Sequence, residues 1–345
     1  MSWAHCKAVN SFVAPKPLAA LWGHPTNGAL GRVFPQSRRD ALSERVELVP
    51  GVVTAANFSQ YAEAMRDVEV IFSTWGMWCP SDAQLDALPN LKAVFYAAGT
   101  VKPFAAPFLR RGILVVSAWA ANAVPVAEWT LAQILLANKG FFRNTREFSE
   151  LRTRGVFVGR GNFGATVSLL GAGQIGRRVI EFLRPFRLNV LAFDPYLSEE
   201  DALGLGVEKV GLEEAFARGN VVSNHIANVP ATMGMLGGEH FAEMPLHATF
   251  INTGRGATVR HDELLRVLQA RPDLTALLDV TDPEPLPKDS PFWTLPNVQL
   301  TSHIAGSIGD EVVRMADLMI EEFDRWRIGE LPLYSVTPDM LETMA

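Results

Sequence analysis

The feature that most constrains the fold is a glycine turn between an apolar run and a helical pattern. The apolar run 167–170 leads into Gly171-Ala172-Gly173-Gln174-Ile175-Gly176, which has the pattern Gly-x-Gly-x-x-Gly. A second apolar run, 189–193, ends at Asp194, eighteen residues after Gly176. This order of strand, glycine turn, helix, strand and acid is typical of a unit that binds a dinucleotide. An ordinary strand-to-helix turn would explain neither the three glycines nor the acid.

Each position of this turn has a physical reason. Gly171 permits the tight turn, Gly173 lets the backbone approach a pyrophosphate, and Gly176 allows the helix to pack closely on the strand. The free N–H groups and the dipole at the helix N-terminus favour an anion. Asp194 can accept hydrogen bonds from the ribose hydroxyls and would repel a 2′-phosphate, and no arginine follows in 195–197 to hold one. NAD is therefore favoured over NADP as the cofactor.

Composition limits the class of protein. The chain has 345 residues, of which 48% are hydrophobic and 20% charged, which predicts two ordinary globular domains. The formal net charge of −6 offers no basic surface for nucleic acid. No apolar run is long enough for a membrane span, and Pro15 and Pro17 interrupt the N-terminal stretch, so no signal peptide is predicted. Cys6 and Cys79 imply neither a disulfide framework nor a zinc site, so we expect no metal and a cytoplasmic location.

Strand-like and helix-like segments alternate along the chain, which predicts an α/β fold of parallel sheets covered by helices. Five strands are expected in the first 120 residues, at 18–22, 46–48, 68–73, 91–97 and 113–117. Six more follow, the number that a complete dinucleotide domain uses, at 167–170, 189–193, 220–224, 248–252, 275–279 and 298–301. Long helical patterns at 124–148 and 310–328 are predicted to join the domains. The expected domains are a discontinuous substrate-binding one, 1–121 with 309–345, and a dinucleotide-binding one, 122–308.

Three further motifs follow predicted strands of the second domain, at 252–256, 279–287 and 301–306. Ligands of such sheets bind beyond the carboxyl ends of the strands, so these motifs are expected to converge. Arg255 offers a fork of donors to a carboxylate or carbonyl oxygen. His303 can donate a proton to a ketone oxygen near neutral pH, and Glu284 would orient the imidazole.

Taken singly, each of these residues has a structural alternative. His303 could cap the final helix, Arg255 could be a solvated turn residue, and Glu284 could be an exposed loop carboxylate. Asp279 could accept hydrogen bonds from nearby backbone amides. Their joint placement at strand ends favours a functional role.

Together these motifs resemble those of the NAD-dependent D-2-hydroxyacid dehydrogenases, the family of D-lactate, D-glycerate and 3-phosphoglycerate dehydrogenases and hydroxypyruvate reductases. The resemblance runs from about Asn122 to Gly306 and more loosely over the flanking region. The expected architecture is a Rossmann-type doubly wound parallel sheet for NAD and a flavodoxin-like α/β substrate domain, joined by long helices. The resemblance implies hydride transfer between NAD(H) and a 2-oxo acid or D-2-hydroxy acid. Arg255 would anchor the substrate, His303 would act as acid and base, and Glu284 would assist it.

The resemblance also implies which residues contact the ligands. Asp279 would face the nicotinamide carboxamide, and Asn122 would lie at the mouth of the cleft. The implied cofactor contacts are Gly171, Gly173, Gln174, Ile175, Gly176, Asp194, Ile226, Ala227, Thr253, Gly254, Arg255, Asp279, His303 and Gly306. The implied substrate contacts are Arg255, Asn122 and the segment Ala98, Gly99 and Thr100, which would present backbone N–H groups to the carboxylate.

Some positions depart from the family pattern or leave alternatives open. Ser302 replaces a usual proline, and Arg260 replaces a helix-capping aspartate, so that Asp262 is expected to cap instead. Trp75-Gly76-Met77-Trp78 follows a strand of the first domain, which suggests that Trp75 lines a pocket for a bulky or apolar 2-oxo acid. The alternative is that Trp75 and Trp78 pack against a domain or subunit interface.

Two other functions use the same scaffold. One is a nucleotide-sensing binding protein like the corepressor relatives of the family, and the other is a dehydrogenase of a non-carboxylate oxyanion such as phosphite. The resemblance further implies a homodimer formed through the long helix near 124–148. Domain closure is expected about hinges near Ala121 and Ile308.

Overall fold

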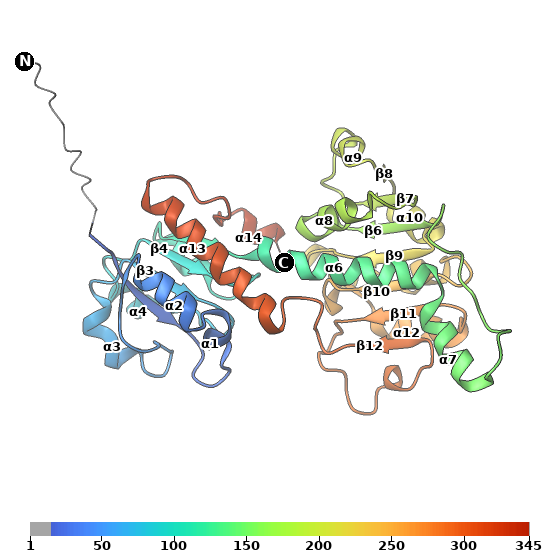
Figure 1. The fold of residues 1–345 in the computed structure, drawn as a ribbon, viewed down its shortest axis with the longest axis horizontal. Helices are drawn as coiled ribbons and strands as arrows, with labels where there is room; N and C mark the ends of the chain where they lie inside the picture. Colours follow the sequence, from blue (N-terminus) through green and yellow to red (C-terminus); the bar gives the residue numbers. More distant parts are fainter. Residues whose placement is uncertain (1–14, 345) are drawn as a thin grey trace, which may run out of the picture.

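The computed structural model describes residues 15–344, which form two parallel sheets, each covered by helices (Figure 1). Cys6 and most of the N-terminal apolar stretch lie outside these residues. The central strands of both sheets are buried along their whole length, as expected of parallel strands with helices on both faces. The predicted α/β class with two parallel sheets is confirmed.

The first unit is built on a five-stranded sheet with the order β2-β1-β3-β4-β5, the flavodoxin-like order. Its strands are β1 (Leu18–Trp22), β2 (Glu47–Leu48), β3 (Val70–Ser73), β4 (Ala93–Tyr96) and β5 (Leu114–Ser117). Its helices are α1 (Ala29–Val33), α2 (Gln36–Ser43), α3 (Phe58–Met65), α4 (Asp82–Asp86) and α5 (Ala105–Arg110). The sequence predicts all five strands, although their ends differ by a few residues.

The second unit is a seven-stranded sheet with the order β12-β11-β10-β9-β6-β7-β8. Its strands are β6 (Thr166–Leu170), β7 (Asn189–Phe193), β8 (Glu208–Lys209), β9 (Val221–Asn224), β10 (Thr249–Asn252), β11 (Thr275–Leu278) and β12 (Val298–Leu300). Its helices are α8 (Gln174–Leu183), α9 (Glu199–Leu205), α10 (Leu212–Arg218), α11 (Gly238–Ala242) and α12 (His261–Ala270). Because β6 pairs with both β7 and β9, the chain reverses direction across the sheet at this point, where doubly wound sheets bind their ligands.

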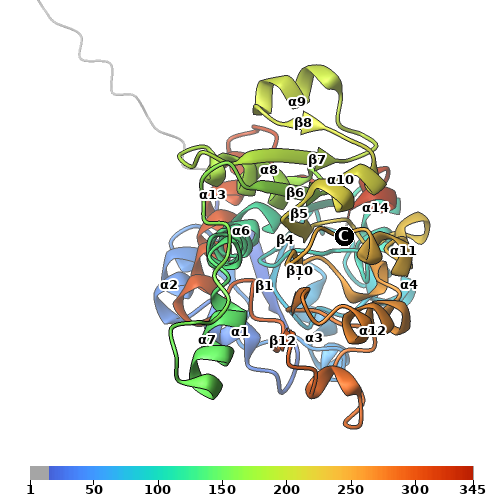
Figure 2. The same ribbon diagram turned by 90° about the vertical axis from the view of Figure 1, so that its right-hand side faces the viewer.

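Two segments join the units. Helix α6 (Trp119–Asn138) leaves β5 and runs along the second sheet, where it packs on α8, and Figure 2 views it nearly end-on. Helix α13 (Val313–Arg327) returns over the first sheet and buries Met319 and Phe323 completely in its core. A short helix, α14 (Met340–Thr343), follows.

The single long helix predicted at 124–148 is wrong, because the chain turns between α6 and α7 (Phe141–Leu151). Gly140 adopts a φ of 72°, which favours glycine. A side chain there would also meet the backbone N of Gly159 at 2.7 Å and the ring of Phe157 at 2.6 Å. The segment that contains Phe157 and Gly159 therefore packs against this turn. Pro125, expected in the first helical turn, lies inside α6.

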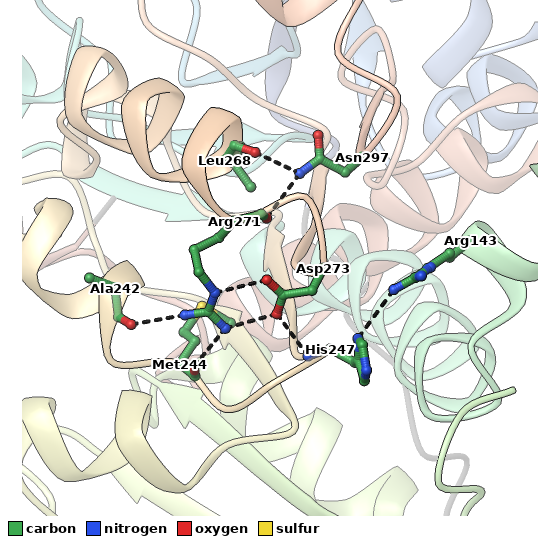
Figure 3. Close-up of polar contacts among 8 residues, drawn as sticks. All are labelled: Arg143, Ala242, Met244, His247, Leu268, Arg271, Asp273 and Asn297. Atoms are coloured by element: carbon green, nitrogen blue, oxygen red, sulfur yellow. Dashed lines mark hydrogen bonds and ion pairs between the residues drawn. The ribbon is translucent and has the colours of Figure 1, made fainter. Parts of the chain in front are cut away.

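A polar network ties together the amino ends of β10, β11 and β12 (Figure 3). Asp273 accepts two hydrogen bonds of 2.8 Å from the guanidinium of Arg271 and one of 3.1 Å from the backbone N–H of His247. Arg271 also donates to carbonyl oxygens at the end of α11, and Asn297 donates to the last carbonyls of α12. This edge of the sheet is opposite the glycine turn, so the network stabilises the fold and stands apart from the candidate site.

Replacing Asp273 with asparagine is expected to lower the free energy of unfolding by about 1 kcal/mol at pH 7. The hydrogen bonds from Arg271 lower the pKa of Asp273 from 3.8 to about 2. The carboxylate therefore stabilises the fold above pH 3.8, and this contribution is lost as the pH falls through about 2. Urea unfolding at pH 7 and at pH 2 measures the difference, with Asp289→Asn in an exposed loop as the control. A loss that is the same at both pH values would contradict the assignment.

Candidate functional site

The glycine turn folds as its sequence requires. Gly171 has a φ of 96°, and a Cβ atom there would lie 2.8 Å from the carbonyl oxygen of His225. A Cβ atom at Gly176 would lie 2.0 Å from the carbonyl oxygen of Gly171. A Cβ atom at Gly173 would meet no atom of the described residues within 4 Å. Gly171 and Gly176 are thus needed by the fold itself, whereas Gly173 leaves the start of α8 open.

The start of α8 offers hydrogen-bond donors. Gly173 is its N-cap residue and has no side chain to cap the first N–H groups, which belong to Gln174 and Ile175. Asp194 closes the other side of the turn, since its carboxylate accepts hydrogen bonds of 2.7 Å from Ala172 N and 2.8 Å from Tyr196 N. This arrangement places open N–H donors and a carboxylate at neighbouring strand ends, as a dinucleotide needs.

Substituting alanine at two of these glycines should have opposite effects. Gly173→Ala is expected to weaken NADH binding by about 10-fold or more and leave the melting temperature unchanged, because the methyl group fills only open space that a pyrophosphate must approach. Gly176→Ala is expected to lower the melting temperature because its Cβ collides with the turn. NADH fluorescence titration and thermal unfolding of both variants check this. Equal destabilisation by both changes would contradict it.

The imidazole of His303 pairs with the carboxylate of Glu284. The distance from His303 Nδ1 to Glu284 Oε1 is 2.7 Å, and the two side chains are 45% and 42% exposed. Because Nδ1 is engaged by the carboxylate, Nε2 remains for a ligand. Both side chains line an open pocket of about 550 Å³ whose other walls include Leu286, Trp293 and Leu300.

The loop of His303 is held by a buried carboxylate. His303 has a φ of 61°, which is unusual for a residue other than glycine. Asp279 accepts hydrogen bonds from Ile304 N at 2.8 Å, Ala305 N at 3.1 Å and the Thr301 hydroxyl at 2.7 Å. Asp279 therefore accepts hydrogen bonds from backbone amides, as the structural alternative predicted. These hydrogen bonds hold the loop that positions His303. The alternative that His303 caps the final helix is wrong, since α13 begins at Val313.

Arg255 is set by a buried amide network at the ends of β9 and β10. Asn224 Nδ2 donates to Asn252 Oδ1 at 3.0 Å and to the Thr258 hydroxyl at 2.9 Å, and that hydroxyl donates to Arg255 O at 2.8 Å. Burial lowers the pKa of Arg255 and the charge of Glu284 raises it. The guanidinium and the imidazole thus both interact with one carboxylate.

Gly256 brings the Arg255 loop against the Glu284 loop. A Cβ atom at Gly256 would lie 2.0 Å from the carbonyl carbon of Thr281. On the other side, a Cβ atom at Gly254 would lie 3.4 Å from the carbonyl oxygen of Ile226. Thr253 lies beside the same loop, with its hydroxyl 3.3 Å from His225 Nδ1, and the carbonyl of Ala227 accepts a hydrogen bond from Thr232. The predicted cofactor residues of these loops are therefore neighbours.

The predicted substrate residues of the first unit lie after β4. The hydroxyl of Ser117 donates to the carbonyl oxygens of Ala98 and Gly99, at 2.9 and 2.5 Å. Within residues 15–344, the backbone N–H groups of Gly99 and Thr100 have no hydrogen-bond acceptor. These two groups are free to bind an anion.

Asn122 connects this segment to the His303 loop. It lies near the start of α6, and its Oδ1 accepts a hydrogen bond of 3.1 Å from Ser307 N. Its amide group lies 3.5 Å from the Cβ position of Gly306 and 3.7 Å from that of Gly99. The two units thus meet at Asn122.

The tryptophan segment after β3 is mostly a packing element. Trp78 stacks on Trp22 with ring centroids 4.3 Å apart, and Met77 is buried in the same core. Trp75 is half-buried against that core, and its carbonyl oxygen accepts a hydrogen bond from Asn27. Met77 and Trp78 thus pack on the core of the first unit, which matches neither the pocket nor the interface that the sequence suggested, and Trp75 stays a candidate.

Two side chains of the site were not predicted. His225 is the first residue after β9, with Nε2 3.0 Å from the Ser223 hydroxyl, and burial lowers its pKa to about 4. Lys102 reaches from the first unit to the carbonyl oxygen of Asn228, at 3.0 Å. Its position two residues after Thr100 is the signal that could have identified it.

Asp262 does not cap α12 as predicted. The N-cap residue is Arg260, which makes no capping hydrogen bond and instead forms ion pairs with Glu239 and Glu263. In the described part of the chain, no helix combines the length and apolarity that crossing a membrane requires. Nor do three or more His, Cys, Asp or Glu side chains gather there in a metal-binding group.

Comparison with known families identifies the fold and the cofactor domain. The model of the NAD-binding domain of the D-isomer specific 2-hydroxyacid dehydrogenases matches residues 131–305, about half of the chain. The chain belongs to this family. The predicted resemblance and the predicted NAD cofactor are thus confirmed, and the matched region contains the glycine turn, Arg255, Glu284 and His303.

Curated relatives of this family member have several names. It is 28% identical over 287 residues to D-3-phosphoglycerate dehydrogenase of Methanocaldococcus jannaschii. The matched region covers 81% of this chain and 54% of that protein. It is also 28% identical to glyoxylate reductase of Korarchaeum cryptofilum, over 81% of this chain and 86% of that protein. The chain therefore spans about half the length of the D-3-phosphoglycerate dehydrogenases that it matches.

Solved structures of the family share the fold. A phosphoglycerate oxidoreductase from Rhizobium etli has a TM-score of 0.77 at 25% identity, covering 93% of this chain and 98% of that one. Apo D-mandelate dehydrogenase of Rhodotorula graminis has a TM-score of 0.77 at 21% identity over the same shares of the two chains, and supports the fold alone.

Proposed function

We propose that this protein reduces a 2-oxo acid to a D-2-hydroxy acid with NADH and catalyses the reverse reaction with NAD. The observation that supports the proposal most is the hydrogen bond of 2.7 Å between His303 and Glu284, whose charge also acts on Arg255. These side chains lie beyond the carboxyl ends of strands in an NAD-binding sheet. The three side chains come from loops after β10, β11 and β12, where such sheets place their ligands.

Each residue has a role in this reaction. The free N–H groups of Gly99 and Thr100 and the fork of Arg255 hold the substrate carboxylate and its ketone oxygen. His303 donates its Nδ1–H to Glu284, so Nε2 holds the proton that passes to the ketone oxygen. The nicotinamide supplies or accepts the hydride. Holding the two reactants in contact supplies much of the remaining rate.

Other features of the proposal rest on the same loops. Asp194 supports NAD over NADP, because a carboxylate there would repel a 2′-phosphate. We assign 1–121 with 309–345 to substrate binding and 122–308 to the dinucleotide, with closure about hinges near Ala121 and Ile308. An exposed free thiol at Cys79 suits a reducing compartment, and we place the protein in the cytoplasm.

A panel of 2-oxo acids tests the reaction. Oxidation of NADH at 340 nm is expected with at least one acid and to be slower with NADPH. Tight NADH binding without turnover of any acid would favour the nucleotide-sensing alternative. Reduction of NAD by phosphite, without turnover of any acid, would favour the oxyanion alternative.

A homodimer through α6 and α7 is expected because apolar side chains are exposed there. Phe141 and Phe148 of α7 are 44% and 52% exposed, and Phe163 in the following loop is 76% exposed. Analytical ultracentrifugation should give twice the chain mass of 37.8 kDa. Phe148→Asp is expected to shift the protein toward the monomer, whereas Leu203→Asp on the exposed face of α9 should not. A monomeric wild type would contradict the assignment.

A further inference from the structure

Lys102 lies where the two units meet. It follows β4 in the loop that carries the free N–H groups of Gly99 and Thr100. Its Nζ atom donates a 3.0 Å hydrogen bond to the carbonyl oxygen of Asn228, in the loop after β9. This lysine therefore spans the boundary between the segment that would bind substrate and a loop of the NAD-binding domain.

The ammonium group of Lys102 lacks a counter-ion in the described part of the chain. Among residues 15–344 it forms no ion pair, and its acceptor is a neutral carbonyl oxygen, although an ammonium has three N–H donors. It is half-buried, and burial together with the positive charge of Arg255 lowers its pKa. Two neighbouring cations in a partly buried site repel each other until an anion joins them.

The carboxylate whose charge acts on Arg255 is not an ion-pair partner of Lys102 among the described residues. Glu284 interacts with the charge of Arg255 and is hydrogen-bonded to His303 at 2.7 Å. In the proposed function, Arg255 and the N–H groups of Gly99 and Thr100 already bind the carboxylate next to the ketone. A donor set for a further anion remains at Lys102.

We propose that Lys102 binds a second anionic group of the substrate, so that the preferred substrates are 2-oxo acids with a carboxylate or phosphate at the far end of the molecule. This inference rests on the proposed function. It names a specificity-determining side chain and a substrate class. It also replaces the expectation of a bulky or apolar 2-oxo acid, which rested on a segment whose Met77 and Trp78 pack on the core.

Binding to the NAD-loaded protein tests this without turnover, because neither NAD nor a 2-oxo acid can reduce the other. Isothermal titration compares 2-oxoglutarate with 2-oxopentanoate, which has the same chain length and a methyl group in place of the distal carboxylate. The wild type is expected to bind 2-oxoglutarate about 10–100-fold more tightly. Lys102→Met should remove this preference and change the affinity for 2-oxopentanoate by no more than about threefold, while Lys102→Arg keeps most of it.

The control variant is Lys92→Met, which breaks a surface ion pair with Glu69 in the same unit and should leave the preference intact. An equal loss for both acids in Lys102→Met would overturn the inference, because Lys102 would then serve the reacting carboxylate or the domain contact. Weaker NAD binding in Lys102→Met, with an unchanged preference, would overturn it in favour of the cofactor diphosphate. Turnover without any charge preference contradicts this inference alone, whereas a charge preference without turnover contradicts the proposed reaction alone.

Discussion

Replacing His303 with glutamine is expected to lower kcat for 2-oxo acid reduction by about 10²–10⁴-fold. Glutamine can still donate a hydrogen bond to Glu284, which lies 2.7 Å from the imidazole, but it cannot transfer a proton to the ketone oxygen. The affinity for NADH should stay within about threefold of the wild type, because the glycine turn is distant in the sheet order from β12. Steady-state kinetics and NADH titration measure the two effects.

His247→Gln is the matched control for this change. His247 has a φ of 65° and His303 one of 61°, so both substitutions place glutamine in the left-handed region. His247 precedes β10 at the opposite edge of the sheet, where it joins the network around Asp273. A comparable loss of kcat in both variants would mean that backbone strain, and not proton transfer, explains the effect at His303.

Much of the second unit could be predicted because its glycine turn and its strand order leave clear patterns in the sequence. A Cβ atom at Gly171 or Gly176 would lie only 2.8 or 2.0 Å from a backbone oxygen, so the turn needs glycine at both positions, and their spacing makes the turn recognisable in the sequence. Arg255, Glu284 and His303 each follow a strand of a parallel sheet, and the carboxyl ends of such strands share one edge. Their positions after successive parallel strands were therefore enough to predict that these three side chains lie near one another.

Features that depend on contacts between distant segments were missed. The turn at Gly140 is set by Phe157 and Gly159, which lie beyond the amphipathic pattern that predicted one continuous helix. Strand β8 has two residues and no apolar run, so it exists only through its pairing with β7. Lys102 is an ordinary charged residue until the fold places Asn228 beside it.

The tryptophans after β3 show a related limit, because a residue predicted to bind a ligand can instead pack on the core. Trp78 follows a strand, as a ligand-binding residue would, yet it is partly buried and stacks on Trp22, which is fully buried in the core. Large aromatic side chains contribute most when they are buried, so position after a strand does not decide between a pocket and the core. The direction of the side chain decides, and it depends on neighbours that are distant in sequence.

Arg255→Lys is expected to lower kcat/KM by about 10²-fold with every acid that the wild type reduces. Arginine offers planar paired donors to the carboxylate and the ketone oxygen, whereas lysine is a single point charge on a flexible stem. Burial already lowers the pKa of Arg255, and a lysine in the same surroundings loses its proton more easily. The loss should therefore grow as the pH rises from 7 to 9.

The pH dependence separates this role from a general disturbance of the loop. Arg260→Lys is the control, because Arg260 lies in the same segment but forms ion pairs with Glu239 and Glu263 outside the site. The control should retain kcat/KM within about threefold, since exposed ion pairs contribute little. If Arg255→Lys kept the activity of the wild type across this pH range, the paired donors of the guanidinium would not hold the substrate, and its anchor would have to come from the N–H groups after β4 alone.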